Sequence, residues 1–199
     1  PGTIDNDLYG TDFTIGFDTA INTVCEAVDK IRDTADSHGR VFFVEVMGRD
    51  AGYIALYSGI GCGASGIFIP EEKDDLAHFI TALSSRRLTK SAHIILVAEG
   101  DEYGGAYRLA EHTQKVLPEL DIRVSVLGHI QRGGNPTCID RILASKLGVA
   151  AVEALLQGKS NVMVGEVKGE IVLTPLEKAI KHHQTIDSPL LHLSHILAI

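Results

Sequence analysis

The stretch Val41-Phe42-Phe43-Val44-Glu45-Val46-Met47 is the clearest indication of fold class in this chain of 199 residues. Its β-branched and aromatic side chains pack well on a pleated sheet, and the run is too short for a typical helix. Gly48 follows directly and can end the element. The stretch therefore predicts a buried strand.

Helices and strands are predicted to alternate on both sides of this strand. Before it, apolar residues recur at helical spacing from Phe17 to Ile31, which predicts an amphipathic helix. After it, the pattern predicts helices over 51–57, 73–88 and 107–117 and strands over 66–69, 92–98 and 122–127. This alternation is typical of an α/β protein with three layers, in which a mostly parallel sheet carries helices on both faces.

The remaining part of the chain is predicted to be more mixed. After a loop over 129–136, a long helix is expected from about Thr137, its capping residue, to Gln157. A strand pair over 161–167 and 170–173 follows. Thr174-Pro175-Leu176-Glu177 has the pattern of a capping box and predicts one more helix. The apolar end, residues 188–199, gives no clear prediction.

Composition and charge exclude several classes of function. Lys and Arg number 18 and Asp and Glu 26, so the formal net charge is −8. No basic block is longer than Arg86-Arg87, so neither a nucleic acid nor an anionic membrane is expected as the main partner. No apolar run approaches the roughly 20 residues of a membrane span, and no signal peptide is recognised. These features predict a cytoplasmic protein.

The cysteines Cys25, Cys62 and Cys138 are widely spaced and follow no CxxC or Cys/His pattern. Their spacing indicates neither a disulfide framework nor a zinc site, which suits a reducing compartment. Because Cys25 and Cys138 fall within helical patterns, we expect both to be core residues rather than nucleophiles.

Three loops, residues 1–7, 47–50 and 128–134, are richer in glycine, charge and hydroxyl groups than simple connections need to be. Each lies next to a predicted strand. In an open parallel sheet the ligand sits beyond the carboxyl ends of the strands. We therefore expect a binding site where these loops gather.

The first two loops each allow a chemical and a plain interpretation. Asp5 and Asp7 could divide the work of a proton acceptor and of a carboxylate facing a metal-bound phosphate, although spacing alone favours a simple turn. Gly48 permits close approach of a ligand, and Arg49 could stabilise phosphoryl charge with its planar guanidinium. A solvated pair of Arg49 and Asp50 is an equally good interpretation.

The third loop combines His129 and Arg132 with flanking glycines. This combination suits a bound phosphate, because the imidazole, the guanidinium and nearby backbone N–H groups can all donate to it. A flexible turn accounts for Gly133-Gly134 but leaves the pair of His129 and Arg132 unexplained.

Together, these motifs resemble the ATP-dependent 6-phosphofructokinases of bacterial type. The resemblance runs from Pro1 to about Ile180 and rests on Pro1-Gly2-Thr3-Ile4-Asp5-Asn6-Asp7, Val46-Met47-Gly48-Arg49 and Gly128-His129-Ile130-Gln131-Arg132-Gly133-Gly134 with Asp140-Arg141. It implies phosphoryl transfer from ATP to the 1-hydroxyl of D-fructose 6-phosphate, giving fructose 1,6-bisphosphate and ADP in the committed step of glycolysis. It also implies Mg2+ as cofactor, allosteric control and a homotetramer with shared active sites.

The resemblance implies catalytic roles for four residues. Asp5 matches the catalytic base and Thr3 the residue that orients the sugar hydroxyl. Arg49 matches the residue that stabilises the transferring phosphoryl group. Asp7 matches a supporting carboxylate that acts on magnesium indirectly, so no direct metal ligand is predicted.

Other residues match those that bind the sugar phosphate in this family. Met47, Gly48 and Glu99 match residues that line the sugar or bind its hydroxyls. His129 and Arg132 match residues that hold the 6-phosphate.

Three further arginines match functional residues of the family. Arg40 and Arg123 match phosphate-binding arginines that reach in from the neighbouring subunit. Arg32 matches an arginine of the allosteric effector site. Ser65 stands where the family often has an acidic residue, which leaves the effector response open.

The resemblance also implies a division of the chain. Residues 1–16 and 130–179 would belong to a larger ATP-binding domain, 17–129 to a smaller domain that binds fructose 6-phosphate, and 180–199 to a tail. The glycine-rich phosphate loops of the family's amino-terminal half are not found, and the chain opens at Pro1 without an initiator Met. We therefore expect a carboxyl-terminal portion that holds the sugar site and the base.

Two alternative functions remain at this point. One is a pyrophosphate-dependent phosphofructokinase, but such relatives typically carry Lys at the position of Gly2. The other is a non-catalytic regulatory module that binds sugar phosphates. It would predict loss of a catalytic carboxylate, whereas Asp5, Asp7 and Arg49 are all present.

Overall fold

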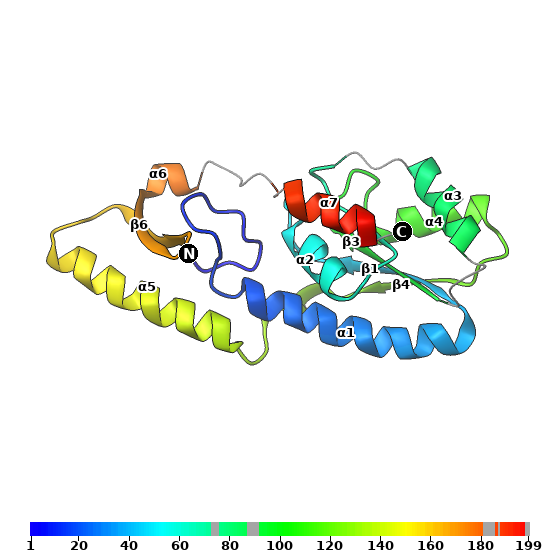
Figure 1. Cartoon of the computed structure of the whole chain (residues 1–199), viewed down its shortest axis with the longest axis horizontal. Coiled ribbons are helices and arrows are strands. Elements are labelled where there is room, and N and C mark those ends of the chain that lie inside the picture. Colours follow the sequence, from blue (N-terminus) through cyan, green and yellow to red (C-terminus); the bar gives the residue numbers. More distant parts are fainter. Residues whose placement is uncertain (73–75, 87–91, 181–185, 187, 198–199) are drawn as a thin grey trace.

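The computed structural model describes residues 1–72, 76–86, 92–180, 186 and 188–197, and its centre is a four-stranded sheet (Figure 1). The strands are β1 (Val41–Val46), β2 (Gly66–Phe68), β3 (His93–Ala98) and β4 (Ile122–Val126). Their order is β2-β3-β1-β4, and every pairing is parallel. The predicted buried strand is thus β1, which pairs on both sides.

Helices cover both faces of the sheet (Figure 1). One face carries α1 (Phe17–His38), α2 (Tyr53–Gly61) and, packed against α2, α7 (Ser188–Leu197). The other face carries α3 (Leu76–Arg86) and α4 (Ala106–Val116). The three-layer α/β fold predicted from the sequence is therefore confirmed.

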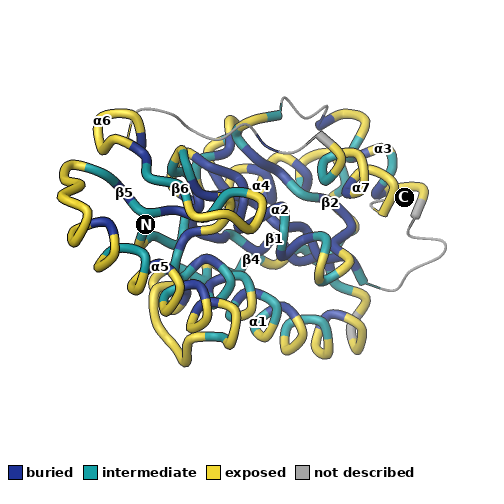
Figure 2. The backbone as a smooth tube through the Cα atoms, turned by 60° about the vertical axis from the view of Figure 1, so that its left-hand side comes forward, coloured by how far each residue is buried: buried dark blue, intermediate teal, exposed yellow. Residues whose placement is uncertain are grey.

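Successive residues of β1 enter two different hydrophobic cores. Phe42, Val44 and Val46 pack with α1 and α2, whereas Val41 and Phe43 pack with α3 and α4. All five side chains are at most 8% exposed. Burying one such side chain contributes about 1.5–3 kcal/mol, so the strand stabilises both layers at once. Figure 2 shows the sheet as a buried centre between exposed helices.

A second group of elements lies beside the amino-terminal loop (Figure 1). It consists of α5 (Cys138–Leu156), the antiparallel pair β5 (Val162–Val167) and β6 (Glu170–Pro175), and the short α6 (Leu176–Ala179). Backbone bonds tie the loop to this group, from Asp12 N to the Glu166 carbonyl at 2.8 Å and from Tyr9 N to the Ala179 carbonyl at 3.3 Å. The loop thus links the hairpin to the sheet.

Several predicted element boundaries and environments are corrected by the structure. Residues 128–132 form a 3-10 helix, η1 (Gly128–Arg132), instead of a plain loop. Thr174 belongs to β6, so it caps no helix, and α6 is a single turn without a side-chain cap. Cys138 is exposed at the start of α5 and Cys25 is only half-buried, so neither is a full core residue. The predicted helix 73–88 is described only over Leu76–Arg86.

The long helix begins where the sequence predicts. Thr137 accepts a hydrogen bond from Asp140 N at 3.3 Å through Oγ1, which is a side-chain cap of α5.

Within the described ranges, no helix has both the length and the apolarity that crossing a membrane requires.

Candidate functional site

The three glycine-rich and charged loops meet at one edge of the sheet. β1 ends before Met47, β3 ends before Glu99, and β4 leads into η1. Because β1 lies between β3 and β4, the carboxyl ends of these strands are neighbours. Arg49 N donates to Glu99 Oε1 at 2.8 Å and Met47 N donates to Gln131 Oε1 at 3.2 Å, so these loops are bonded to one another.

Asp5 lies near Glu99 and Arg132 of this edge. Its backbone N–H donates to Thr3 Oγ1 at 3.2 Å, and the Thr3 hydroxyl also bonds its carboxylate. Burial raises the pKa of Asp5, and the nearby carboxylates of Asp7 and Glu99 raise it further. The Arg132 guanidinium opposes this effect. The structure thus brings Asp5 together with four other residues that the sequence had singled out.

The loop that carries Asp5 is fixed by buried polar contacts that sequence analysis did not identify. Asn6 is 2% exposed and adopts a left-handed φ of 55°. Its side chain donates to the Asp12 carbonyl at 3.1 Å and accepts from Thr14 N at 2.8 Å. Thr14 Oγ1 in turn donates to the Thr3 carbonyl at 2.7 Å. These bonds hold both Thr3 and Asp5 in position.

The segment after β1 has an unusual backbone. Gly48 has a φ of 146° and Arg49 a φ of 56°, which is uncommon for a residue with a side chain. A Cβ atom on Gly100 would lie 2.1 Å from the Arg49 carbonyl oxygen, so the loops after β1 and β3 approach as closely as backbone allows. This packing presents Arg49 at the edge.

The side chain of Arg49 is 81% exposed, and its Nε lies 3.9 Å from Asp50 Oδ2. This geometry matches the solvated pair that was an alternative at the sequence level. An exposed guanidinium whose backbone is bonded to Glu99 can also turn toward an anionic ligand. Met47 and Gly48 are buried next to it.

Gln131 is the polar residue of this edge whose importance the sequence analysis missed. It is 1% exposed, its Oε1 accepts from Met47 N, and its Nε2 donates to the Gly128 carbonyl at 3.0 Å. In a 3-10 helix residues three apart share a face, so η1 turns Gln131 inward with Gly128 while His129 and Arg132 stay exposed. The residue types of 128–132 do not mark Gln131 as the buried one.

Asp140 connects the two groups of elements from a buried position. Its carboxylate accepts from Gly16 N and Thr19 N at 2.8 Å each and from the Thr19 hydroxyl. Gly16, the N-cap residue of α1, has no side chain to satisfy the first N–H groups of that helix. Asp140, from the first turn of α5, therefore caps α1.

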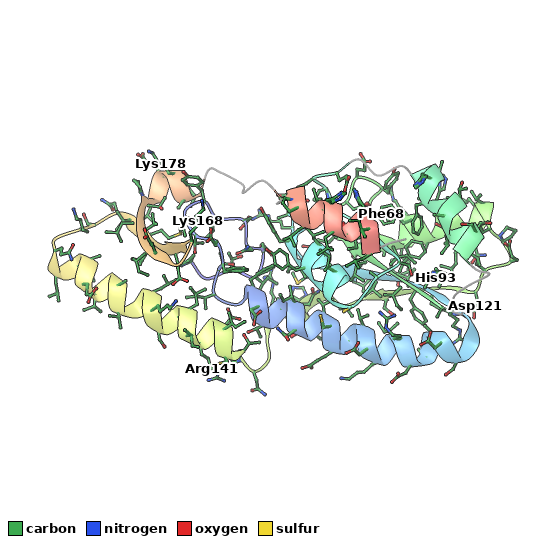
Figure 3. The ribbon with its side chains drawn as sticks, viewed as in Figure 1. Phe68, His93, Asp121, Arg141, Lys168 and Lys178 are labelled. Atoms are coloured by element: carbon green, nitrogen blue, oxygen red, sulfur yellow. The ribbon has the colours of Figure 1, made fainter. Side chains whose placement is uncertain are left out.

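Arg40 and Arg123 lie at the opposite edge of the sheet. Arg40 precedes β1 and Arg123 is near the start of β4, so β1 separates them from the loops described above. Both contact Asp121, through Arg40 Nε at 2.8 Å from Oδ2 and Arg123 Nη2 at 2.9 Å from Oδ1. Figure 3 shows Asp121 at the opposite end of the view from Lys168 and Lys178. The two arginines are not brought to Asp5 within one chain.

Arg32 lies on α1. Its Nη2 donates to the Cys62 carbonyl at the end of α2. Ser65 is 8% exposed, and its Oγ is 3.1 Å from His93 Nδ1. A buried, bonded hydroxyl supplies no negative charge near Arg32.

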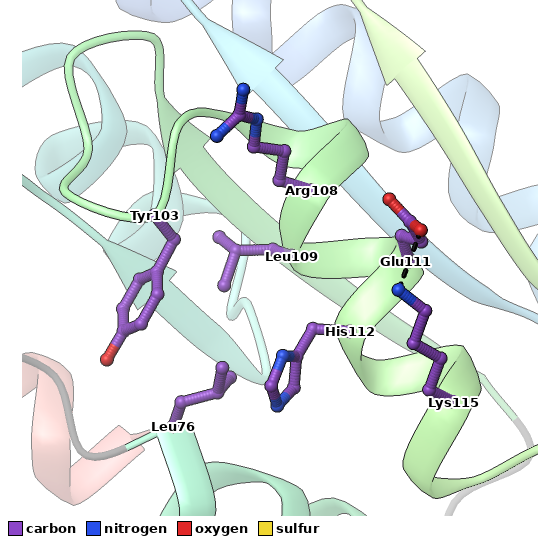
Figure 4. Close-up of a pocket in the computed structure, with 7 residues that line it drawn as sticks. All are labelled: Leu76, Tyr103, Arg108, Leu109, Glu111, His112 and Lys115. Carbon is purple, nitrogen blue, oxygen red and sulfur yellow. Dashed lines mark ion pairs between the residues drawn. The ribbon is translucent and has the colours of Figure 1, made fainter.

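Two hollows in the described surface differ in their relation to these loops. A cavity of about 280 Å³ has walls from the first loop, η1 and the start of α5, and Gln131, Arg132, Asp140 and Arg141 are among its lining residues. A larger one of about 450 Å³ lies between α3 and α4, and its lining is shown in Figure 4. Tyr103 and His112 line it, whereas none of the predicted site residues does. The smaller cavity is the one that adjoins the candidate site.

The described residues include no group of three or more His, Cys, Asp or Glu side chains arranged to hold a metal ion. Asp5 and Asp7 are nevertheless close enough for one to affect the other. Such a carboxylate pair fits a magnesium ion that keeps its waters and is carried mainly by phosphate oxygens.

Comparison with known proteins identifies the family of this chain. Residues 1–155 match the family described as phosphofructokinase. ATP-dependent 6-phosphofructokinase 1 of Thermus thermophilus is 58% identical over 200 residues, which cover 100% of this chain and 62% of that protein.

Solved structures extend the comparison. Phosphofructokinase from Saccharomyces cerevisiae has a TM-score of 0.84 and 34% identity, over 99% of this chain and 27% of that one. A pyrophosphate-dependent phosphofructokinase from Marinobacter aquaeolei shares the fold, with a TM-score of 0.80 and 24% identity over 100% of this chain and 59% of that one. The chain spans less than two thirds of the curated relative's length, 62%. It belongs to the phosphofructokinase family.

Proposed function

We propose that the protein containing this chain transfers a phosphoryl group from ATP to the 1-hydroxyl of D-fructose 6-phosphate and releases fructose 1,6-bisphosphate and ADP, the committed step of glycolysis. The observation that carries this proposal is the position of Asp5 among Thr3, Asp7, Glu99 and Arg132 at the carboxyl edge of the sheet. A half-buried carboxylate with a raised pKa is suited to accept the hydroxyl proton.

Within this proposal the cations of the edge have separate tasks. Arg132 and His129, both exposed on η1, bind the 6-phosphate of the sugar. Arg49 turns from Asp50 toward the transferring phosphoryl group and neutralises its charge. Glu99 accepts a hydrogen bond from Arg49 N and keeps a second oxygen for a sugar hydroxyl. Met47 and Gly48 form the wall beside them.

The residues of this site would hold a magnesium ion mainly through the phosphate oxygens of the nucleotide. When bound, Mg2+ neutralises charge on the phosphate oxygens of the donor. Asp7 is the residue of this chain that would face it, and Asp7 also keeps the pKa of Asp5 raised. Thr3 orients the attacking hydroxyl toward Asp5.

Two observations support ATP over pyrophosphate as the donor. The Thermus relative is named ATP-dependent at 58% identity, whereas the pyrophosphate-dependent structure is only 24% identical. Gly2 also leaves open the position that Lys occupies in pyrophosphate-dependent relatives, and a Cβ atom there would meet nothing within 4 Å. A nucleotide can therefore approach without meeting an ammonium group.

The same proposal covers assembly and location. The protein is a cytoplasmic homotetramer in which Arg40 and Arg123 bind the phosphate of a neighbouring subunit's sugar, and Arg32 belongs to an effector site. Residues 1–16 and 130–179 belong to the ATP-binding domain, 17–129 to the sugar domain and 180–199 to a tail. Residues 181–185, 187 and 198–199 of that tail lie outside the described ranges.

The test is a steady-state assay of the full-length protein with fructose 6-phosphate and either Mg-ATP or Mg-pyrophosphate. We expect turnover with ATP in the range of ordinary kinases, about 1–100 per second, and little with pyrophosphate. A Gly2→Lys variant, which the open space around Gly2 can accommodate, should lose efficiency with ATP. Faster turnover with pyrophosphate, or none with either donor, would reject the proposal.

A further inference from the structure

Two of the chain's cysteines lie in contact with each other. Cys25 is on α1, and Cys62 is the C-cap residue of α2. Their side chains form a hydrogen bond. A second observation places Cys25 Sγ at the end of α2: a Cβ atom on Gly61, the residue before Cys62, would lie 3.7 Å from it. The packing of α1 on α2 therefore joins two thiols that are distant in sequence.

The surroundings make the two thiols unequal. The hydrogen bond from Cys62 lowers the pKa of Cys25, while this same bond and then burial raise the pKa of Cys62. The Asp29 carboxylate, one turn along α1 from Cys25, raises both. Arg32 lowers the pKa of Cys62 and also donates to its carbonyl. Cys25 is thus the thiol that ionises more easily, and the thiolate is the reactive form.

The pair is also accessible and can adjust its geometry. Cys25 and Cys62 are both half-buried, and Cys62 lies between the exposed residues Gly61 and Gly63. Gly63 has a φ of 60° and open space around its Cα. A disulfide needs specific torsions, and the glycines on either side of Cys62 allow the chain turn to adjust toward them.

We propose that Cys25 and Cys62 are a site of reversible oxidation that closes to a disulfide between α1 and the end of α2. With a small disulfide such as glutathione disulfide as oxidant, the Cys25 thiolate attacks one sulfur and releases one glutathione thiolate. The deprotonated Cys62 then attacks the Cys25 sulfur of the mixed disulfide and releases the second. One S–S bond breaks, one forms, and the two thiol protons end on two glutathione molecules.

The cross-link would fix a contact that already joins the two helices. Arg32 holds the Cys62 carbonyl, so closure of the disulfide keeps α2 against α1 at this point. A cross-link between distant residues restricts the unfolded chain, and the oxidised protein is therefore expected to melt at a higher temperature than the reduced protein. This inference does not depend on the proposed kinase activity.

The experiment treats the folded, full-length protein with glutathione disulfide, denatures it, alkylates the remaining thiols and maps them by mass spectrometry. We expect Cys25 and Cys62 to escape alkylation and to appear in one linked peptide that dithiothreitol separates. In the Cys62→Ser variant Cys25 should stop as a mixed disulfide with glutathione. The Cys138→Ser variant is the matched control, because Cys138 lies on α5 and is exposed, and its loss should leave the linked peptide unchanged.

Two results would overturn the proposal, and both can be read from wild-type protein if a variant fails to fold. One is wild-type protein in which Cys138 reacts with glutathione disulfide, whereas Cys25 and Cys62 stay as free thiols and are alkylated in the next step. The other is wild-type protein in which Cys25 carries glutathione and no linked peptide forms. A melting temperature that oxidation leaves unchanged, despite a linked peptide, would contradict the expected restraint of α1 and α2.

Discussion

At the scale of single residues, the properties of Asp5 follow from its neighbours. Burial and then the Asp7 carboxylate favour its protonated form in the folded protein; Arg132 opposes them, and Glu99 adds a smaller effect in the same direction as Asp7. A base with a raised pKa works near neutral pH but costs stability there, because its charged form is disfavoured by the fold. Activity and stability thus make opposite demands on this residue.

The Asp5→Asn variant of the full-length enzyme should therefore lose kcat by several orders of magnitude and gain melting temperature at neutral pH. Because folding raises this pKa, the stability contributed by Asp5 is fully present below its ordinary pKa of 3.8 and is lost as the pH rises through the folded-state value. The gain from Asn should shrink as the pH falls below that range. Near-normal turnover would remove Asp5 from the mechanism.

Gln131 should matter through the position of its neighbours. The Gln131→Met variant keeps the volume but leaves Met47 N and the Gly128 carbonyl without their side-chain partner, which costs about 1–3 kcal/mol of stability. It should also lower kcat/KM for fructose 6-phosphate.

A matched glutamine separates this effect from simple destabilisation. Gln114 on α4 likewise bonds backbone carbonyls, at 3.1 Å to Pro118 and to Leu120, but lies away from the candidate site. Gln114→Met should destabilise the protein with normal kinetics. Equal kinetic effects of the two variants would contradict a positioning role for Gln131.

The charged residues of the candidate site could be identified from the sequence more readily than the buried amide residues that fix their position. Asp5, Arg49 and Arg132 stand out in short motifs, and the structure brings the first and last together. Asn6 and Gln131 do not stand out, because an amide side chain reveals nothing about burial. Their role depends on contacts with Asp12, Thr14 and Met47 that only the fold creates.

At the scale of elements, periodicity predicted the strands and helices, whereas their ends depend on tertiary contacts. α1 continues past Ile31 to His38. It ends there because Gly39 adopts a left-handed φ of 63°. The capping box at Thr174 fails because β6 pairs Thr174 with Met163 of β5. Pairing with β5 thus outweighs the local preference of Thr174 for a helix cap.

Asp140 gives the clearest prediction at this scale. Asp140→Ala removes the acceptor for Gly16 N and Thr19 N at the start of α1, and we expect a loss of about 1.5–3 kcal/mol in the free energy of unfolding. Asp140→Asn keeps one acceptor oxygen and should lose less. Asp18→Asn, in the first turn of α1 itself, is the control for a general effect of charge near the helix start. An unchanged denaturation midpoint for Asp140→Ala would show that α1 does not depend on this cap.

At the scale of the whole molecule, the sheet separates two sets of cations. Asp5, Arg49 and Arg132 lie at its carboxyl edge, while Arg40 and Arg123 share Asp121 at the amino edge. The sequence resemblance assigned the second pair to the site of a neighbouring subunit, which stays a prediction. Arg40 precedes the predicted strand 41–47 and Arg49 follows it, so the sequence places them at opposite ends of that strand, but spacing alone gives no sign of a neighbouring subunit.

The central claim is that one active site combines the carboxyl edge of one chain with the amino edge of another. Arg40→Ala alone should raise the half-saturating concentration of fructose 6-phosphate by about 10–100-fold, as expected for loss of a charged hydrogen bond. Asp5→Asn alone should abolish turnover.

The decisive measurement mixes the Arg40→Ala and Asp5→Asn proteins, lets their subunits exchange, isolates the hybrids and assays them at low fructose 6-phosphate. We predict that the hybrids regain activity that neither parent has, because some sites then combine an intact Asp5 with an intact Arg40. Verified hybrids that show no such recovery would contradict the shared site.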